Sequence, residues 1–270
     1  MKEINIEESK QIQVKILSYV DMICRKHQIK YSLYGGTLIG AIRHKGFIPW
    51  DDDIDIIMPR EDYKRLIQVF DNNGIYVLHS LENDKDYESP YAKVEDSRTL
   101  LEENSTTKNY GIAIDIFPCD YVGDTKQDAI RFVKRREIIR KLYLSKLVIP
   151  SHRNKWYKRI AIVLLKTLLV CVNIRSIAVL RSNMAQKINE RTKYSADVVL
   201  ASNYGIKEII PTDMFDHLIQ VEFEGLNFYA FEKYHLYLSS VFGNYMQLPP
   251  EDKRKSPHTI MKMFWKTIEA

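Results

Sequence analysis

Four of the five positions from 51 to 55 are aspartates, within the stretch "WDDDIDIIMP" of residues 50–59. Carboxylates this close repel one another, and one of them takes up a proton unless a cation neutralises the group. Mg²⁺ prefers such oxygen ligands and usually keeps waters or substrate phosphates as further ligands. The cluster therefore predicts a divalent-cation site that acts on a phosphorylated substrate.

The spacing of these aspartates also suits a single ion. Alternate residues of a strand point to one face, so Asp51, Asp53 and Asp55 share a side if the strand begins as early as Asp51. Their Cα atoms would then follow one another at about 6.5–7 Å. The same alternation directs Asp52 to the opposite face. An acidic loop or helix cap in solvent is the alternative, because exposed aspartates are common.

A second apolar segment, "IAIDIFP" of residues 112–118, carries the single acid Asp115. A lone carboxylate among Ile and Phe side chains is costly to bury unless something pairs with it. A cation shared with Asp53 and Asp55 would provide that partner. The apolar surroundings of both segments favour a metal site over an acidic loop in solvent.

The segment "YSLYGGTLIGAIRHKG", residues 31–46, reads as a short strand, a glycine turn and a helix. Backbone N–H groups at such a helix start form a pocket suited to phosphate, which makes Gly35, Gly36 and Thr37 candidate phosphate-binding residues. A simple tight turn is the alternative. Arg43, near the helix end, is a further candidate for binding phosphate, although a basic residue there also complements the helix dipole.

The spacing of apolar residues predicts the helices and strands that would position these candidate site residues. Helices are expected at residues 7–29, 37–46, 60–74 and 232–243, with a long basic helical stretch at 125–193. Strands are expected at 53–59, 75–80 and 110–120, the last stopped by Pro118, with a strand–turn–strand unit at 91–104 and a hairpin at 221–231. We therefore predict an α+β fold with a mixed α/β lobe over residues 1–124 and a mostly helical lobe over 125–270.

The composition and net charge of the chain exclude some classes of protein. The chain has 270 residues, 45% hydrophobic content and a net charge of +5, which allows a sizeable core and favours anionic partners. This charge falls short of the basic stripe of a nucleic-acid binder, so no nucleic-acid partner is expected. The three cysteines are far apart and show no metal-ligand spacing, which argues against a disulfide framework or a structural zinc site. The charged amino terminus lacks an apolar signal core, so a cytoplasmic location is expected.

Three blocks of the chain resemble LicD-type phosphotransferases. The first and most specific is "YGGTLIGAIRHKGFIPWDDDIDIIMPREDY", residues 34–63. The others are "GIAIDIFPCD", residues 111–120, and "FGNYMQLPPEDKRKSPH", residues 242–258. The resemblance runs from about residue 5 to about residue 260 and is weakest over 125–200. It implies a core sheet like that of nucleotidyltransferases, with flanking helices.

The resemblance also assigns roles to particular residues. It implies that Asp53, Asp55 and Asp115 bind metal, and that Gly35 and Gly36 form the phosphate turn. Asp51 matches a further acid of the family, and either Asp51 or Asp115 would accept the proton of the acceptor hydroxyl. Basic positions that would hold a diphosphate are matched by Lys253, Arg254 and His258, for which a solvated tail is the alternative.

The reaction implied by the resemblance transfers a phospho-alcohol, first of all phosphocholine from CDP-choline, to a sugar hydroxyl of a cell-surface glycan and releases CMP. The acceptor would be of teichoic acid or lipopolysaccharide type, and the cofactor Mg²⁺ or Mn²⁺. Trp50 and Tyr34 are candidate aromatic partners for the choline ammonium group, although core packing would explain both. The alternatives are CDP-ribitol or CDP-glycerol as donor, a metal-dependent glycosyltransferase, a true nucleotidyltransferase and an inactive binding protein.

Residues 155–181 suggest contact with a membrane. In helical projection five polar residues of this segment fall within about 100° of one another, and these are Lys155, Lys158, Arg159, Lys166 and Asn173. A basic stripe on an apolar helix can lie on an anionic membrane surface, here the cytoplasmic face of the inner membrane, where a lipid-linked acceptor would be found. A core helix with one solvated face is the alternative.

Overall fold

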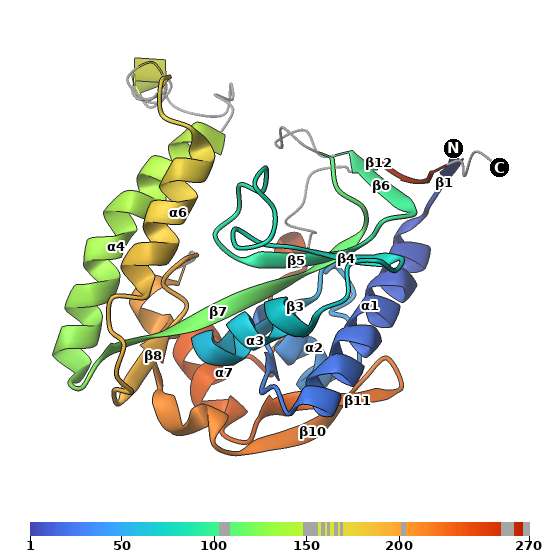
Figure 1. The fold of residues 1–270 in the computed structure, drawn as a ribbon. Coiled ribbons are helices and arrows are strands. Elements are labelled where there is room, and N and C mark those ends of the chain that lie inside the picture. The colour runs from blue at the N-terminus through green and yellow to red at the C-terminus, as the bar shows by residue number, and fades with distance from the viewer. Residues whose placement is uncertain are drawn as a thin grey trace.

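A computed structural model gives the structure of the chain. It describes residues 1–102, 109–147, 156–157, 160, 163–164, 167, 170–200, 204–254 and 262–266. Helices and strands mix along the chain, which confirms the predicted α+β class. A sheet crosses the middle of the molecule, helices flank it, and a helical pair stands beside it (Figure 1).

The main sheet positions the acidic segments. Its strands run in the order β2 (Ser32–Leu33), β3 (Asp55–Pro59), β7 (Ala113–Gly123), β5 (Ala92–Asp96) and β4 (Tyr76–His79). The neighbours β3 and β7 are parallel, and the other pairs along this path are antiparallel. Two short strands, β8 (Tyr194–Ala196) and β9 (Ile210–Pro211), extend the sheet from the far end of β7. The two apolar acidic segments found in the sequence are therefore adjacent strands.

Strand β7 continues to Gly123, three residues beyond the predicted end, because Pro118 lies inside it and does not stop it. On one side of β7, pairing with β5 ends at Ile116 and pairing with β8 begins at Asp120. Pro118 falls in this gap, so its missing N–H removes no hydrogen bond from either of these ladders. The prediction that Pro118 ends the strand was wrong for this reason.

Three helices cover the sheet near the acids, and their bounds are α1 (Ile6–His27), α2 (Gly35–His44) and α3 (Arg60–Val69). The side chain of Asn5 caps α1 by accepting a hydrogen bond from the backbone N–H of Glu8 at 2.8 Å. The predicted periodicity of α1 is confirmed, since its apolar stripe is buried against the sheet. Helices α2 and α3 both pack against β3, which fixes the strand that carries Asp55.

The carboxy-terminal hairpin shares its core with the sheet. Strands β10 (Leu218–Phe223) and β11 (Leu226–Phe231) turn at Gly225, and α7 (Tyr234–Phe242) follows them. Strand β11 packs against β2, and β10 packs against α2. The largest hydrophobic cluster therefore contains buried side chains from both sides of residue 124. Division of the chain into two lobes at that residue stays a prediction.

Two helices form an arm beside the sheet. The pair α4 (Lys126–Leu147) and α6 (Ile174–Ala185) packs side by side, with one end against β7 and β8 and the other standing away from the hairpin (Figure 1). A separate small sheet joins β1 (Lys2–Glu3), β12 (Lys262–Trp265) and β6 (Thr99–Glu102). Short 3-10 helices are η1 (Gly205–Glu208), η2 (Thr212–Phe215) and η3 (Glu251–Lys253). Among the described residues, none of the helices is both long and apolar enough to cross a membrane. The basic stripe predicted within residues 155–181 stays a prediction, because Lys155, Lys158, Arg159 and Lys166 lie outside the described residues.

Candidate active site

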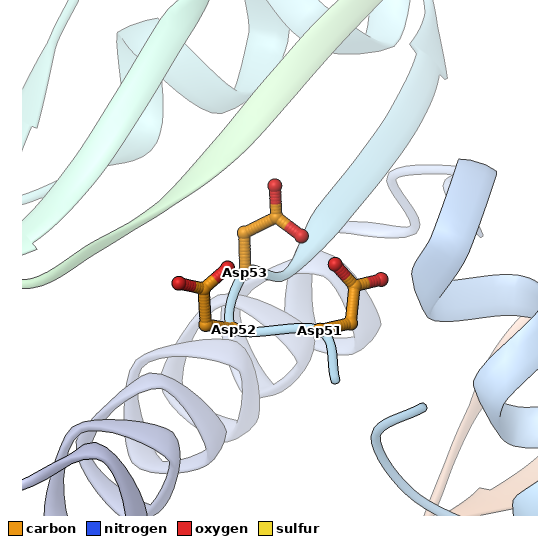
Figure 2. Close-up of side chains that lie close together, drawn as sticks. All are labelled: Asp51, Asp52 and Asp53. Carbon is orange, nitrogen blue, oxygen red and sulfur yellow. The ribbon is translucent and has the colours of Figure 1, made fainter. Parts of the chain in front are cut away.

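Three aspartates converge on a short loop immediately before β3. Carboxylate oxygens of Asp51, Asp52 and Asp53 all lie within 4.8 Å of one another, and each residue is partly exposed. Figure 2 shows their side chains leaving the loop on the same side. The buried Gln13 of α1 holds the loop, because its Nε2 donates to the carbonyl of Asp52 at 2.7 Å. Such a group of oxygen ligands suits a divalent cation.

The place of Asp52 differs from the prediction. Strand β3 begins only at Asp55, so residues 51–54 do not follow strand alternation. The loop turns between Asp51 and Asp53, which lets Asp52 join its neighbours instead of pointing to the opposite face. No local pattern of residues marks where strand β3 starts.

Asp55 and Asp115 face each other across the parallel pair β3 and β7, where they are direct register partners. Their side chains therefore project from the same face of the sheet. Burial raises the pKa of the Asp55 carboxyl well above its ordinary value, and the charges of Asp53, Asp115 and Asp51 raise it further. An added cation would relieve this crowding of negative charge.

Lys93 on β5 was not predicted as a residue of the site. It is the register partner of Asp115 on the other side of β7, and its Nζ lies 3.1 Å from Asp115 Oδ1. The positive charge of Lys93 also acts to lower the pKa of Asp55. Within the described part of the chain, Asp55 and Asp115 are not in the group of acids that meets the 4.8 Å distance, which consists of Asp51, Asp52 and Asp53. The set predicted to bind metal, Asp53 with Asp55 and Asp115, stays a prediction.

The predicted glycine turn lies against the acids. Gly35 has φ +53°, and a Cβ placed there would lie 3.6 Å from Asp55 Oδ2. A Cβ on Gly36 would overlap the carboxylate of Asp51. Thr37 ties the two segments together, because its Oγ1 accepts a hydrogen bond from the backbone N–H of Asp55 at 2.9 Å. The start of α2 and the acidic loop therefore form one site.

Arg43 has a structural contact in this site. Its Nη1 donates to the carbonyl of Tyr245 at 2.5 Å, and its Nε donates to His44 Nε2 at 2.8 Å. Burial lowers the pKa of the Arg43 guanidinium. These contacts hold the third sequence block beside α2, and binding of phosphate by Arg43 stays a prediction.

The third block reaches the acids through Arg254. Its guanidinium lies 5.8 Å from the centre of the ring of Trp50, the residue that precedes Asp51 in the sequence. The Nε of Arg254 donates to the carbonyl of Pro249 at 2.9 Å. Lys253 is exposed at the end of η3. His258 lies outside the described residues. The structure thus brings Arg254 next to the acidic loop, a contact between segments about 200 residues apart in sequence.

Three aromatic residues near the acids differ in exposure. Tyr34 is buried, donates to Glu208 Oε1 at 3.1 Å and stacks on Tyr237, so it belongs to the core. Trp50 is half-buried beneath Arg254. Tyr204, which the sequence analysis missed, is 42% exposed. Burial raises the pKa of Tyr204, and the charges of Glu208 and Asp51 raise it further.

The site as a whole has the features of a protein that handles phosphates with a cation. Acids lie on two parallel strands and on the loop before one of them, and the N-terminus of α2 meets them. This arrangement agrees with the nucleotidyltransferase-like core that the resemblance in sequence implies. Residues 28–153 match the family model described as "LicD/FKTN/FKRP, nucleotidyltransferase domain".

Similarity to a known protein along nearly the whole chain identifies the family more specifically. The chain is 33% identical over 271 aligned residues to the lipopolysaccharide cholinephosphotransferase LicD of Haemophilus influenzae, covering 98% of this chain and 99% of that protein. An uncharacterized protein of Rickettsia typhi is 33% identical over 84 residues, which cover 30% of this chain and 27% of that protein. The chain therefore belongs to the LicD family. Because members of this family are phosphotransferases, the prediction of a phosphotransferase enzyme is confirmed.

Proposed function

We propose that this protein transfers phosphocholine from CDP-choline to a sugar hydroxyl of a lipopolysaccharide-type glycan and releases CMP. The observation that carries the proposal is the similarity along nearly the whole chain to a lipopolysaccharide cholinephosphotransferase. The acids and the glycine turn support it, since a diphosphate-linked donor needs both a cation and backbone N–H groups near its phosphates.

The acidic residues fit a bound Mg²⁺ or Mn²⁺. Carboxylates of Asp51, Asp52 and Asp53 already converge, and burial and neighbouring acids raise the pKa of Asp55, which a cation would oppose. We propose that Asp53, Asp55 and Asp115 hold the ion, with Asp51 beside them. The ion, when bound, supplies positive charge that neutralises the diphosphate of the donor.

The residues of the chain would orient and activate the reactants. The sugar hydroxyl oxygen forms a bond to the phosphorus of phosphocholine while the bond from that phosphorus to the oxygen of CMP breaks, and CMP leaves with the electron pair. The hydroxyl proton passes to Asp51 or Asp115. Backbone N–H groups at Gly36 and Thr37 bind phosphate oxygens, and Arg254 with Lys253 adds positive charge from the carboxy-terminal side.

The choline group calls for an aromatic surface, because a quaternary ammonium ion is attracted to the face of a ring. Tyr204 is the candidate that the structure adds, since its ring is partly exposed and the charge of Asp51 acts on its hydroxyl. Trp50 is the second candidate, and Tyr34 is not one, because its ring is buried against Tyr237. Replacing Tyr204 with alanine should therefore weaken the binding of CDP-choline more than the binding of CDP-glycerol.

Thermal stabilisation by donors tests the proposal. The purified chain is heated with CDP-choline, CDP-ribitol, CDP-glycerol, CTP or a UDP-sugar, each with and without Mg²⁺. A ligand present at 100 times its Kd stabilises the folded state by about 2.7 kcal/mol. We expect a Mg²⁺-dependent rise in Tm with CDP-choline that is lost in Asp53→Asn. A rise with UDP-sugars alone would contradict the proposal and favour a glycosyltransferase.

A further inference from the structure

A row of ionisable side chains crosses four strands of the main sheet. Asp55 on β3 is the register partner of Asp115 on β7. Asp115 is in turn the partner of Lys93 on β5, and Lys93 is the partner of His79 on β4. Directly paired residues of neighbouring strands project from the same face of a sheet. The two acids of the site therefore continue into two basic residues, across strands that lie side by side (Figure 1).

Lys93 lies within reach of two carboxylates. Its Nζ is 3.1 Å from Asp115 Oδ1. Glu95 follows two residues later on β5, so its side chain projects from the same face as that of Lys93, with the Cα atoms about 6.5–7 Å apart. Glu95 is only 8% exposed, and a carboxylate buried to that extent needs a cation or several hydrogen-bond donors. Glu95 can therefore compete with Asp115 for the ammonium group of Lys93.

His79 satisfies Glu95 in place of Lys93. His79 Nε2 lies 3.1 Å from Glu95 Oε1, while Glu95 Oε2 accepts a hydrogen bond from the backbone N–H of Gly111. Burial acts to lower the pKa of His79, but its contacts with Glu95 and Asp84 outweigh this and raise the pKa, which favours the charged imidazolium. Both oxygens of Glu95 thus have partners other than Lys93, so the ammonium of Lys93 can pair with Asp115.

The ring of His79 is itself fixed by its surroundings. Its Nδ1 lies 3.0 Å from Asp84 Oδ2, its ring stacks on Tyr87 at 6.0 Å, and it packs edge to face with Tyr110 at 5.0 Å. Asp84 and Tyr87 belong to the loop between β4 and β5, and the helical arm holds this loop. The guanidinium of Arg175 on α6 donates to three backbone carbonyls of the loop at 2.6–2.9 Å. The arm and the loop together therefore keep His79 in position.

We propose that His79 is a positioning residue of the site. By pairing with Glu95, it keeps the ammonium of Lys93 on Asp115 and thereby limits how tightly the acids hold a cation. Without His79, Glu95 would be a buried carboxylate that lacks a cation, which is costly, and Lys93 on the same face of β5 can supply one. The effect on a cation rests on the proposal that Asp115 binds metal, whereas the placement of Lys93 does not.

Crystal structures of four full-length proteins test this placement. These are the wild type, His79→Phe, Glu95→Gln and the double variant that combines both changes, all without metal. In His79→Phe, which keeps an aromatic ring at this position, we expect Lys93 Nζ to leave Asp115 and contact Glu95. In Glu95→Gln and in the double variant it should stay on Asp115, because the amide carries no charge to attract it. Lys93 that stays on Asp115 in His79→Phe, beside a protonated Glu95, would overturn the proposal.

A fifth variant guards against a failure to fold. His79→Gln also lacks the positive charge but keeps a polar side chain that can contact Asp84, so we expect it to release Lys93 to Glu95 as His79→Phe does. An unchanged Tm shows that each variant is folded. Lys93 on Asp115 in both His79 variants would overturn the proposal.

Titration with Mg²⁺, followed by the rise in Tm, tests the consequence for the metal site. Departure of Lys93 from Asp115 moves away a positive charge that repels the ion, so His79→Phe should be half-saturated at about fourfold less Mg²⁺ than wild type. Glu95→Gln alone should keep the wild-type midpoint, and the double variant should return to it.

The direction of the change separates positioning from simple damage. A damaged site would need more Mg²⁺, and either this result or a double variant that stays unlike wild type would overturn the proposal. A wild type that Mg²⁺ does not stabilise would contradict the proposed metal site. In that case the position of Lys93 in the crystal structures would still confirm or overturn the role of His79.

Discussion

At the residue scale, Asp55 is crowded by the negative charges of neighbouring acids. Its side chain is half-buried, and desolvation together with the charges of Asp53, Asp115 and Asp51 raises its pKa above the ordinary 3.8. A carboxyl whose pKa is raised on folding lowers the stability of the folded state. This penalty is absent below pH 3.8, grows between pH 3.8 and the raised pKa, and is constant above it. The metal-free protein should therefore lose stability as the pH rises from 3.8 to the raised pKa of Asp55.

Asp55→Asn tests this penalty directly. At neutral pH the metal-free variant should melt above the wild type, because the amide carries no charge to repel its neighbours. A gain of about 1 kcal/mol would raise Tm by about 2–4 °C in a chain of this size. Mg²⁺ should stabilise the wild type and not the variant. The exposed Asp124→Asn serves as control, and a variant less stable than wild type at neutral pH would contradict the account.

Lys93 should affect the pH dependence of activity. Its ammonium contacts Asp115 and acts to lower the pKa of Asp55, so it favours the ionised form of Asp55. Lys93→Met should move the acid limb of the kcat/KM profile to higher pH, whereas Lys93→Arg should leave it near wild type. An unmoved acid limb in Lys93→Met would show that Lys93 only packs between the strands.

At the element scale, the start of α2 must approach the acidic loop closely. A Cβ at Gly36 would overlap the Asp51 carboxylate, which is the flexible end of a side chain and can move aside. Gly36→Ala should therefore fold at least as stably as wild type, since alanine favours a helix by about 1 kcal/mol over glycine.

The same substitution should damage the site. A displacement of about 1 Å in a reacting group can cost about 10²-fold in rate, so we expect Gly36→Ala to lose about that much kcat/KM. Gly74→Ala is the matched control, because a Cβ there meets nothing within 4 Å. Wild-type activity in Gly36→Ala would contradict the close contact between α2 and Asp51.

Elements that depend on local pattern were predictable from the sequence. The apolar stripe of α1, the glycine turn and the hairpin at Gly225 all follow from residues close together in the chain. Strand register does not, which is why Lys93 was missed although it lies opposite Asp115. The contact between Arg254 and Trp50 was missed for the same reason, since no short-range pattern links them.

At the scale of the whole molecule, the hairpin completes the core on which the site rests. Phe223, Phe228 and Phe231 are at most 1% exposed and pack with the side chains of the sheet. Removal of everything after residue 124 would expose that face of the sheet.

A fragment of residues 1–124 should therefore fail to fold by itself. We expect it to show no cooperative urea transition, while the full chain unfolds in one. In the full chain, Phe228→Ala should lower the free energy of unfolding by about 3–5 kcal/mol. A fragment with a cooperative transition and native circular dichroism would show that the first 124 residues are an independent domain.

Transfer of phosphocholine is the most direct test of the account. The purified protein is incubated with CDP-choline, Mg²⁺ and lipopolysaccharide that lacks phosphocholine, and the glycan and nucleotide products are identified by mass spectrometry. We predict one phosphocholine added to the glycan for each CMP released, with at least about 10²-fold less product from Asp115→Asn. Addition of CMP to the glycan with release of phosphocholine, or no transfer by a protein that binds CDP-choline, would contradict it.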